Sequence, residues 1–325
     1  MIVRFILHHL LLLDVLMVLI PLLVGVCGLW LMRRRRRPGL VVALLGFGVC
    51  LTWVYGRYVG SQELEVTHVE FASEDLPESF DGYRIVHFSD AHVGTPSPRR
   101  DAFLRRAVDS INAQQADMVV FTGDLQNVRV QEVYDHQAIL ARVHGRDGVV
   151  AVLGNHDYAM YLDQNDPYAI AEQLGHTDAV YADLGWRLLR NSHIDIRRDS
   201  ASISFAGMEN DGEGRFPKLG DHNSALYGLR TDAFVVMLEH DPASWRRRIL
   251  PRTHCQLTLS GHTHGGQLSL FGWSPASLFH REYHGMYHVG ERAIYINRGL
   301  AGAIPFRLGC PAEVTVITLK KATHQ

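Results

Sequence analysis

The segment DMVVFTGDL, residues 117–125, predicts how most of this chain is organised. Its first half is a short apolar run rich in β-branched and aromatic residues, which is typical of a buried strand. The run ends in a glycine followed by Asp124. The same arrangement, a buried strand that ends in a small polar motif, recurs in YRIVHFSDAH (83–92), VVAVLGNHD (149–157), FVVMLEHDP (234–242) and LTLSGHTHG (257–265).

Helical patterns lie between several of these strands. Residues 99–114, 131–144 and 167–174 predict helices, and residues 64–71, 293–297 and 313–319 predict further strands. Strands that alternate with helices indicate a layered α/β fold. Because ligands in such folds bind beyond the carboxyl ends of the strands, we expect the polar motifs to converge on one site.

The N-terminal part of the chain is strongly apolar. Residues 10–32 contain one acidic residue, Asp14, and are long enough to cross a membrane as a helix. Five arginines follow at 33–37, and a second apolar run covers 39–58. A cleaved signal peptide is the alternative, but the apolar core is too long and no small-residue cleavage site precedes the arginines. The pattern predicts a two-helix transmembrane hairpin within residues 1–60 and one further domain over 61–325.

The arginine run also predicts an orientation. Short basic loops stay in the cytoplasm, which places the chain after residue 58 on the outer, periplasmic or extracytoplasmic side of the cell membrane. We therefore expect a multi-pass protein of the inner (cytoplasmic) membrane, with the bilayer as its partner. A formal net charge of -2, and apolar spans on both sides of the arginines, argue against a nucleic-acid partner.

The polar motifs contain seven potential metal ligands. They are Asp90, His92, Asp124, Asn155, His240, His262 and His264. Taken singly, each motif has a structural explanation, since Gly-Asp and Gly-Asn are common turn pairs. Together, the oxygen and imidazole ligands suit Mn, Fe or Zn rather than calcium, and the lack of thiolates argues against a structural zinc site. Seven ligands exceed the need of one ion, whereas two ions that share a carboxylate are a usual device for phosphoryl hydrolysis.

In this order the motifs resemble the signature of the calcineurin-like metallophosphoesterase superfamily, D-x-H, G-D, G-N-H-[DE], H and G-H-x-H, over residues 83–319. Within the superfamily the chain resembles the bacterial membrane-anchored branch, through GHTHGGQ (261–267), NRGLAG (297–302) and PFRLG (305–309). The resemblance implies that a four-layer α-β-β-α sandwich follows the hairpin. It also implies a metal-dependent phosphoesterase.

The resemblance further implies roles for individual residues. One ion would be held by Asp90, His92 and His264, the other by Asn155, His240 and His262, with Asp124 as the bridge. A hydroxide between the metals would attack phosphorus in line with the leaving group. His156 would protonate the leaving group or stabilise its charge, and Asp157 would orient that imidazole. The cofactors would be two divalent ions, Mn first and Fe or Zn as alternatives.

Three weaker features leave alternatives open. Arg298 and Arg307 flank a glycine-rich loop and could contact substrate phosphate, with a surface role as the equal alternative. The apolar segment 268–273 is predicted to form a core strand and turn, with contact to a lipid substrate or the bilayer as the alternative. Cys255 and Cys310 could pair outside the cytoplasm, but two unpaired core thiols are favoured.

These features predict a membrane-anchored dimetal phosphohydrolase that cleaves a phosphodiester or pyrophosphate bond. A phosphomonoesterase is the alternative in the same chemistry. A tethered scaffold that has lost catalysis is another, and the presence of all seven ligands and His156 argues against it. The membrane anchor fits a lipid or lipid-linked substrate, although a phosphorylated small molecule satisfies the same chemistry.

Overall fold

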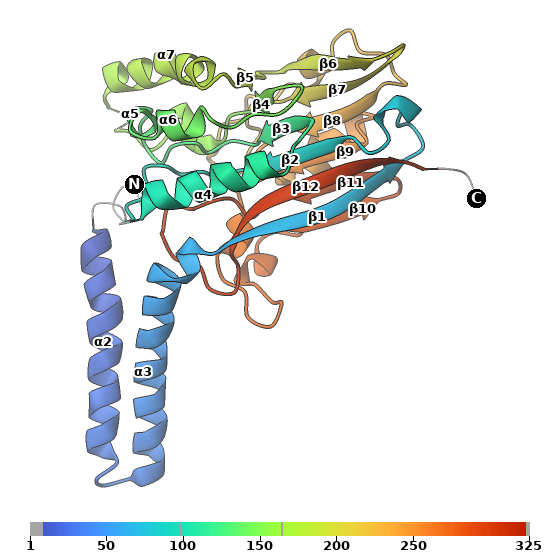
Figure 1. The fold of residues 1–325 in the computed structure, drawn as a ribbon. Coiled ribbons are helices and arrows are strands. Elements are labelled where there is room, and N and C mark those ends of the chain that lie inside the picture. The colour runs from blue at the N-terminus through green and yellow to red at the C-terminus, as the bar shows by residue number, and fades with distance from the viewer. Residues whose placement is uncertain (1–8, 98, 164, 323–325) are drawn as a thin grey trace.

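A computed structural model describes residues 9–97, 99–163 and 165–322 of the 325-residue chain, which form a helical hairpin and a two-sheet body (Figure 1). The hairpin consists of α2 (Leu10–Leu31) and α3 (Arg36–Tyr58). Both helices are long and apolar enough to cross a membrane, and most of their large apolar side chains are exposed. The predicted helices are therefore confirmed, although α3 begins three residues earlier than expected because Pro38 is tolerated in a first turn.

The two helices approach each other closely at small residues. A Cβ atom added to Gly28 would lie 2.3 Å from the Ala43 amide nitrogen, and one added to Gly46 would lie 2.3 Å from the Gly25 nitrogen. Small residues that permit such contact are typical of packed membrane helices, where dispersion replaces the hydrophobic effect between helices.

The hairpin is attached to the body at the end opposite the arginine loop. Asp14 pairs with Arg57 across the hairpin at 3.1 Å and also accepts a hydrogen bond from Trp53 Nε1 at 3.2 Å. The Trp53 ring stacks on Phe306 of the body at a centroid distance of 5.1 Å. The Arg307 amide donates to the carbonyl of residue 56 in α3 at 3.0 Å. Asp14, the one acidic residue in the first apolar run, therefore has a charged partner.

The body contains two six-stranded sheets. The first has the spatial order β1 (Leu64–Ser73), β12 (Ala312–Lys321), β2 (Arg84–Phe88), β3 (Met118–Phe121), β4 (Val149–Ala151) and β5 (Arg187–Leu188). The second has the order β10 (Gly285–Val289), β11 (Arg292–Ile296), β9 (Leu257–Ser260), β8 (Phe234–Leu238), β7 (Ala201–Gly207) and β6 (Ser192–Arg198). Strands β2 to β5 run parallel in the first sheet, and β7, β8, β9 and β11 run parallel in the second.

Alternation along each strand explains why the sheets stack. In β3, Met118 and Val120 belong to the buried cluster between the sheets, whereas Val119 and Phe121 belong to the cluster beneath the helices. The first sheet is covered by α4 (Arg100–Ala113), α5 (Gln131–Tyr134), α6 (Gln137–Leu140) and α7 (Pro167–Asp183). The outer face of the second sheet carries α8 (His222–Ala225), the π-helical turn η4 (Trp245–Ile249) and α9 (Leu250–Arg252).

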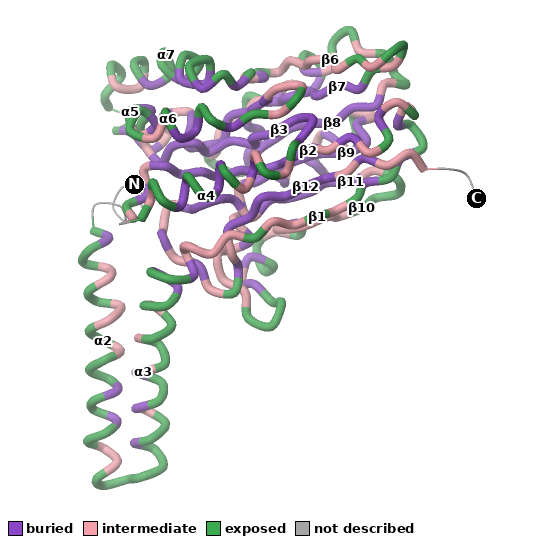
Figure 2. Tube along the Cα trace, viewed as in Figure 1, coloured by how far each residue is buried: buried purple, intermediate pink, exposed green. Residues whose placement is uncertain are grey.

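Three buried hydrophobic clusters therefore occupy the three interfaces between four layers, which confirms the α-β-β-α sandwich. Figure 2 shows the central strands, such as β2, β3, β8 and β9, as continuously buried, whereas the edge strands β1, β6 and β10 are partly exposed. The predicted helix over 131–144 is two single turns, and α7 extends nine residues beyond its predicted end. The edge strands β6 and β10 were not predicted from the sequence, because they carry mostly polar or partly exposed side chains rather than an apolar run.

Candidate metal centre

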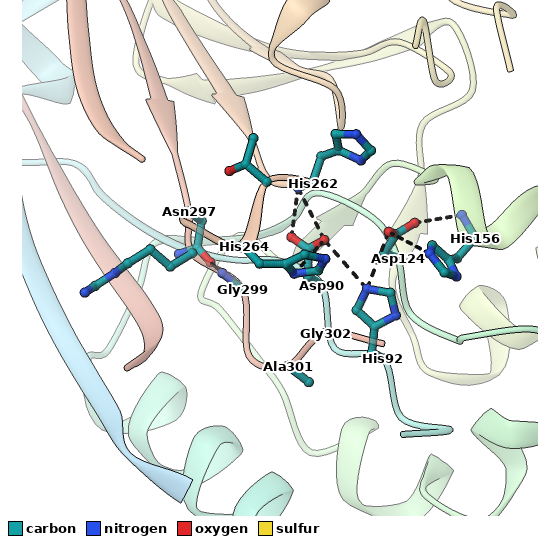
Figure 3. Close-up of polar contacts among 12 residues, drawn as sticks. Asp90, His92, Asp124, His156, His262, His264, Asn297, Gly299, Ala301 and Gly302 are labelled. Atoms are coloured by element: carbon teal, nitrogen blue, oxygen red, sulfur yellow. Dashed lines mark hydrogen bonds and ion pairs between the residues drawn. The ribbon is translucent and has the colours of Figure 1, made fainter. Parts of the chain in front are cut away.

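All seven predicted ligands come together where the parallel strands end. Asp90 and His92 follow β2, Asp124 follows β3, Asn155 follows β4 at the start of η3 (Asn155–Tyr158), His240 follows β8, and His262 and His264 follow β9. Five of these side chains are buried, and those of His262 and His264 are partly exposed, at 13% and 19%. Figure 3 shows Asp90 surrounded by His92, His262 and His264, with Asp124 between His92 and His156.

The ligand atoms form overlapping groups. Asp90, His92 and His264 form one group, with Asp90 Oδ1 3.7 Å from His264 Nδ1 and 3.9 Å from His92 Nε2. Asp124, His240 and His262 form another, in which His240 Nε2 lies 3.3 Å from Asp124 Oδ2. The same Asp124 oxygen is 3.5 Å from His92 Nε2, so this carboxylate links the two groups. His92, Asp124 and His156 form a third possible grouping.

The hydrogen-bonding pattern fits a cation site. Among the described residues, both His92 ring nitrogens, Asn155 Oδ1 and His264 Nδ1 are buried without a hydrogen-bond partner. Buried polar atoms are normally paired, so the free acceptor atoms among them, including the unprotonated nitrogen of His92, fit metal ligands. Asn155 Nδ2 donates to the Tyr161 hydroxyl at 3.0 Å, which leaves the amide oxygen as the available atom.

His240 is oriented in the way expected of a metal-binding imidazole. A carbonyl oxygen only accepts, so His240 Nδ1–H donates to the Thr122 carbonyl at 2.7 Å. That contact leaves Nε2 as the nitrogen that faces Asp124. Backbone partners of this kind fix the tautomer and ring orientation of metal-binding histidines.

Five of the ligands adopt left-handed backbone conformations. The φ angles are 51° for Asp90, 40° for His92, 60° for Asp124, 72° for His262 and 52° for His264. Such conformations cost about 1–3 kcal/mol each for residues other than glycine and cluster at functional sites. At Gly299, whose φ is 73°, a Cβ would lie 2.6 Å from the Asp90 Cβ, so this glycine permits the close approach. The sequence carries no signal for the five angles themselves, because Asp and His occur far more often with negative φ.

Burial and neighbouring charges shift the pKa values of the side chains in the metal-free centre. Burial lowers the pKa of His264 to about 3 and that of His262 to about 4, which keeps both rings neutral. Burial raises the pKa of Asp90 to about 7, and the charge of Asp124 adds to that rise. Burial would raise the pKa of Asp124 as well, but the imidazoles of His240 and His156 hold it well below its ordinary value. His240 differs, since burial would lower its pKa but the charge of Asp124 raises it to about 10, so this imidazole must lose its proton when a divalent metal binds.

His156 lies beside the ligand set and is held by the backbone of another loop. Its Nδ1–H donates to the Asn127 carbonyl at 2.6 Å, and its ring stacks on Tyr161 with centroids 4.1 Å apart. The Nε2 atom, which remains free for chemistry, is 4.0 Å from Asp124 Oδ2.

The prediction that Asp157 orients His156 is wrong. The Asp157 carboxylate accepts backbone N–H groups from Asp124 at 2.9 Å, Leu125 at 3.1 Å and Gly154 at 2.9 Å. It therefore ties together the loops after β3 and β4. Adjacency in the sequence suggested the wrong partner, because residues 156 and 157 sit in a tight turn and their side chains diverge.

The sequence leaves two alternatives open for Arg307, a contact to substrate phosphate and a surface role, and its surroundings in the structure match neither. Its side chain is buried, and its guanidinium donates to the carbonyls of Arg298, Gly299, Ala301, Cys310 and Pro311. Arg298 pairs with Glu65 at 2.8 Å and with Glu313 at 3.3 Å. Since the Ala301 amide donates to the Asp90 carbonyl at 2.8 Å, Arg307 holds the loop that supports the first metal-binding segment.

Replacing Arg307 by Met is expected to lower the free energy of unfolding by about 3 kcal/mol, because several buried carbonyls lose their donor and each costs about 1–3 kcal/mol. The measurement is thermal and denaturant unfolding of the full chain in detergent, with chelator present so that metal loss does not contribute. Arg281→Met is the matched control, since that side chain is largely exposed. Equal stability of the two variants would contradict the assignment.

Two smaller predictions have clear outcomes. Segment 268–273 does form a turn, closed by a bridge between Leu270 and Trp273, but it is not core. The side chain of Phe271 is fully exposed, and those of Leu270 and Trp273 are about half exposed. Cys255 and Cys310 are free, buried thiols, as favoured.

Comparison with known proteins adds independent findings. The family described as calcineurin-like phosphoesterase matches residues 83–266. The chain is similar to the uncharacterized metallophosphoesterase YkuE of Bacillus subtilis, with 32% identity over 82% of this chain and 89% of that protein. It is also 32% identical to a transmembrane protein with metallophosphoesterase domain from Danio rerio, over 83% of this chain and 60% of that protein. The UDP-2,3-diacylglucosamine pyrophosphatase LpxG of Chlamydia trachomatis is 26% identical over 82% of this chain and 92% of its own length.

Proposed function

This chain belongs to the calcineurin-like phosphoesterase family and is a metal-dependent phosphoesterase, and from that premise we propose that it hydrolyses a phosphodiester or pyrophosphate bond at a membrane surface. One observation carries the proposal. Seven potential ligands, two of them carboxylates and several with free acceptor atoms, gather beside His156 in a body attached to an apolar helical hairpin.

We assign the ligands to two divalent ions. Asp90, His92 and His264 would hold one ion, Asn155, His240 and His262 the other, and Asp124 both. Mixed oxygen and imidazole ligands suit Mn, with Fe or Zn as alternatives. Two divalent ions at such a centre supply Lewis acidity to the phosphoryl group and lower the pKa of water.

We assign proton transfer and the positioning of the ligand loops to side chains of this protein. His156 presents Nε2 to the space beside Asp124, because its Nδ1–H is held by the Asn127 carbonyl. In that position Nε2 can pass a proton to the leaving oxygen, a general-acid role. Asp157 keeps the loops that carry Asp124 and Asn155 in fixed register through its three backbone hydrogen bonds.

We also propose that α2 and α3 span the membrane, with the arginine loop in the cytoplasm and the body on the outer side. The two helices satisfy the length and apolarity of a span, and relatives are named as transmembrane proteins. Arg57, at the opposite end of the hairpin, is paired with Asp14. It therefore adds little positive charge at the outer end against this orientation.

The substrate we propose is a lipid or lipid-linked phosphoester. Support comes from the hairpin, which holds the centre close to a bilayer, and from LpxG, which by its name is a pyrophosphatase for UDP-2,3-diacylglucosamine. A membrane anchor raises the concentration of the centre near lipid phosphates.

Hydrolysis assays on the purified full chain in detergent test the reaction class. The substrates are bis(p-nitrophenyl) phosphate, a UDP-linked pyrophosphate diester and p-nitrophenyl phosphate, each with Mn and after chelation. We expect Mn-dependent cleavage of the diester or the pyrophosphate to exceed that of the monoester. Faster cleavage of the monoester would support a phosphomonoesterase instead, and a folded, metal-loaded chain that cleaves none of the three would contradict the proposal.

Tyr161→Phe is expected to weaken binding of the ion assigned to Asn155 by about 10–100-fold, as is usual when a hydrogen bond to a metal ligand is lost. The reason is that the Tyr161 hydroxyl fixes the amide that points Asn155 Oδ1 at the site. Calorimetric titration of Mn into chelator-treated protein measures the change. Tyr168→Phe, on a highly exposed side chain, is the control. Unchanged affinity in Tyr161→Phe would remove Asn155 from the ligand set.

A further inference from the structure

The segment between η5 (His264–Gly266) and β10 exposes an unusual number of apolar side chains. We call residues 270–279 the apolar loop. Its large exposed side chains are Leu270 at 49%, Phe271 at 108%, Trp273 at 52%, Leu278 at 70% and Phe279 at 82% exposure. Five large exposed apolar side chains within ten residues of the chain indicate an interaction site.

Packing within the described part of the chain does not explain why the tip of the apolar loop carries a large apolar side chain. Phe271 and Gly272 are the two central residues of the turn closed by Leu270 and Trp273, with φ angles of 53° and 81°. Such turns favour Asn or Gly, and a bulky residue with positive φ is strained. Phe271 is strained and also fully exposed, so its side chain gains no burial within this chain. Strain without internal compensation points to a contact outside the chain.

The second half of the apolar loop is held firmly to the body. Ser274 Oγ donates to the Gly265 carbonyl at 3.1 Å, and Ala276 is buried at the start of η6 (Pro275–Leu278). This short helix presents Leu278 and Phe279 to the outside. No charged residue occurs from 265 to 279, so entry into an apolar phase carries no cost of burying a charge. Arg281, which is 75% exposed, follows after His280.

The apolar loop lies next to the end of the hairpin that adjoins the body. Its base is paired with residue 308, because the Ser269 amide donates to the Leu308 carbonyl at 2.8 Å. The neighbouring residues 306 and 307 contact α3, through the Trp53–Phe306 stack and the hydrogen bond from the Arg307 amide. In Figure 1 the orange segment before β10 projects from the body in the direction in which the hairpin extends, and Figure 2 shows it as exposed.

We propose that the apolar loop inserts into the same leaflet of the bilayer that the outer end of the hairpin enters, an inference that rests on the membrane placement of the hairpin in the proposed function. Leu, Phe and Trp side chains with a flanking arginine are the composition that binds the boundary between headgroups and acyl chains. The body then has two attachments to the bilayer, α3 and the apolar loop.

This placement has a consequence for the substrate. His262 and His264 lie on the segment that leads into the apolar loop, so its insertion fixes the metal centre relative to the membrane surface. The phosphoryl group of the substrate then lies at the headgroup level of a lipid, while its apolar part stays in the leaflet. A soluble phosphoester has no need of such an arrangement.

Fluorescence quenching of the full chain in phosphatidylcholine–phosphatidylglycerol vesicles tests the insertion. Cys27 and Cys50 are replaced by Ser, which leaves two buried cysteines, and an environment-sensitive dye is attached at Ser277→Cys in the apolar loop. Ser277 is exposed, and its replacement keeps all five apolar side chains. Tyr168→Cys, an exposed site on α7 at the far end of the body, is the matched control, and native Cys27 restored alone reports on the hairpin.

The expected result is that lipids spin-labelled on the acyl chain quench the dye at position 277, while its quenching constant for aqueous iodide is several-fold smaller than that at position 168. Adding Phe271→Ser and Phe279→Ser should abolish the lipid quenching. Equal iodide quenching at 277 and 168 would overturn the inference. Protection from iodide without lipid quenching would also overturn it, in favour of a protein interface. If the dye at Cys27 is not quenched by lipid, the membrane placement itself fails, and both proposals fall.

Discussion

Replacing Asp124 by Asn is expected to lower kcat/KM for a phosphodiester by about three orders of magnitude, since a divalent centre supplies several kcal/mol of stabilisation and each 1.36 kcal/mol is tenfold in rate. Asp124 is the one ligand within reach of both groups, at 3.5 Å from His92 Nε2 and 3.3 Å from His240 Nε2. An amide offers one oxygen and no charge in its place, so it cannot hold two cations together.

Metal content measured with the kinetics separates this effect from misfolding. We expect the Asp124→Asn variant to retain fewer than two ions per chain while its circular dichroism stays unchanged. Asp232→Asn is the control, because that carboxylate is exposed and pairs with the nearby Arg230. A variant that keeps both ions and full turnover would refute the bridging role of Asp124.

Replacing His156 by Ala is expected to lower kcat by about 10²–10⁴-fold, the usual contribution of a general acid or base. The loss should be large for a substrate with an alkoxide leaving group and small for one that releases p-nitrophenolate, which leaves without protonation. This dependence follows from the free Nε2 beside Asp124, since Nδ1–H is held by the Asn127 carbonyl.

Measuring the metal content distinguishes the proton-donor role of His156 from a role as metal ligand, which the geometry also allows. His92, Asp124 and His156 also lie close enough to share an ion. Two ions retained in His156→Ala, with a rate loss that depends on the leaving group, would support the proton-donor role. Loss of an ion with equal rate loss for both leaving groups would make His156 a ligand. His144→Ala, on an exposed imidazole, controls for the general effect of removing a histidine.

Much of the fold was predictable because its signals are local. The helices of the hairpin follow from the length of two apolar runs, which needs no knowledge of other segments. The buried strands β2, β3, β8 and β9 were recognisable because layers cover both of their faces, so they read as continuous apolar runs. Edge strands such as β6 carry no such run, and their existence depends on a neighbour with which to pair.

The position of the site was predictable for a related reason. The carboxyl ends of parallel strands lie at the same edge of a sheet. The polar motifs after the neighbouring strands β2, β3 and β4 are therefore close together at that edge. The seven side chains do come together, although their roles as ligands remain proposals. The left-handed backbone at Asp90 and Asp124 was not predictable, because it is maintained by packing against Gly299 and by the hydrogen bonds of Asp157.

The sequence by itself determined the apolar hairpin, the layered α/β class and the residue types of the metal centre, because hydrophobic periodicity and ligand chemistry are properties of short segments. Only the tertiary structure decided which atoms of those residues face the centre, that Asn127 rather than Asp157 holds His156, that Arg307 is an internal support, and that residues 270–279 are exposed beside the hairpin. Each of these outcomes depends on contacts between segments far apart in the chain, and burial and hydrogen-bond partners are settled only when those segments pack together.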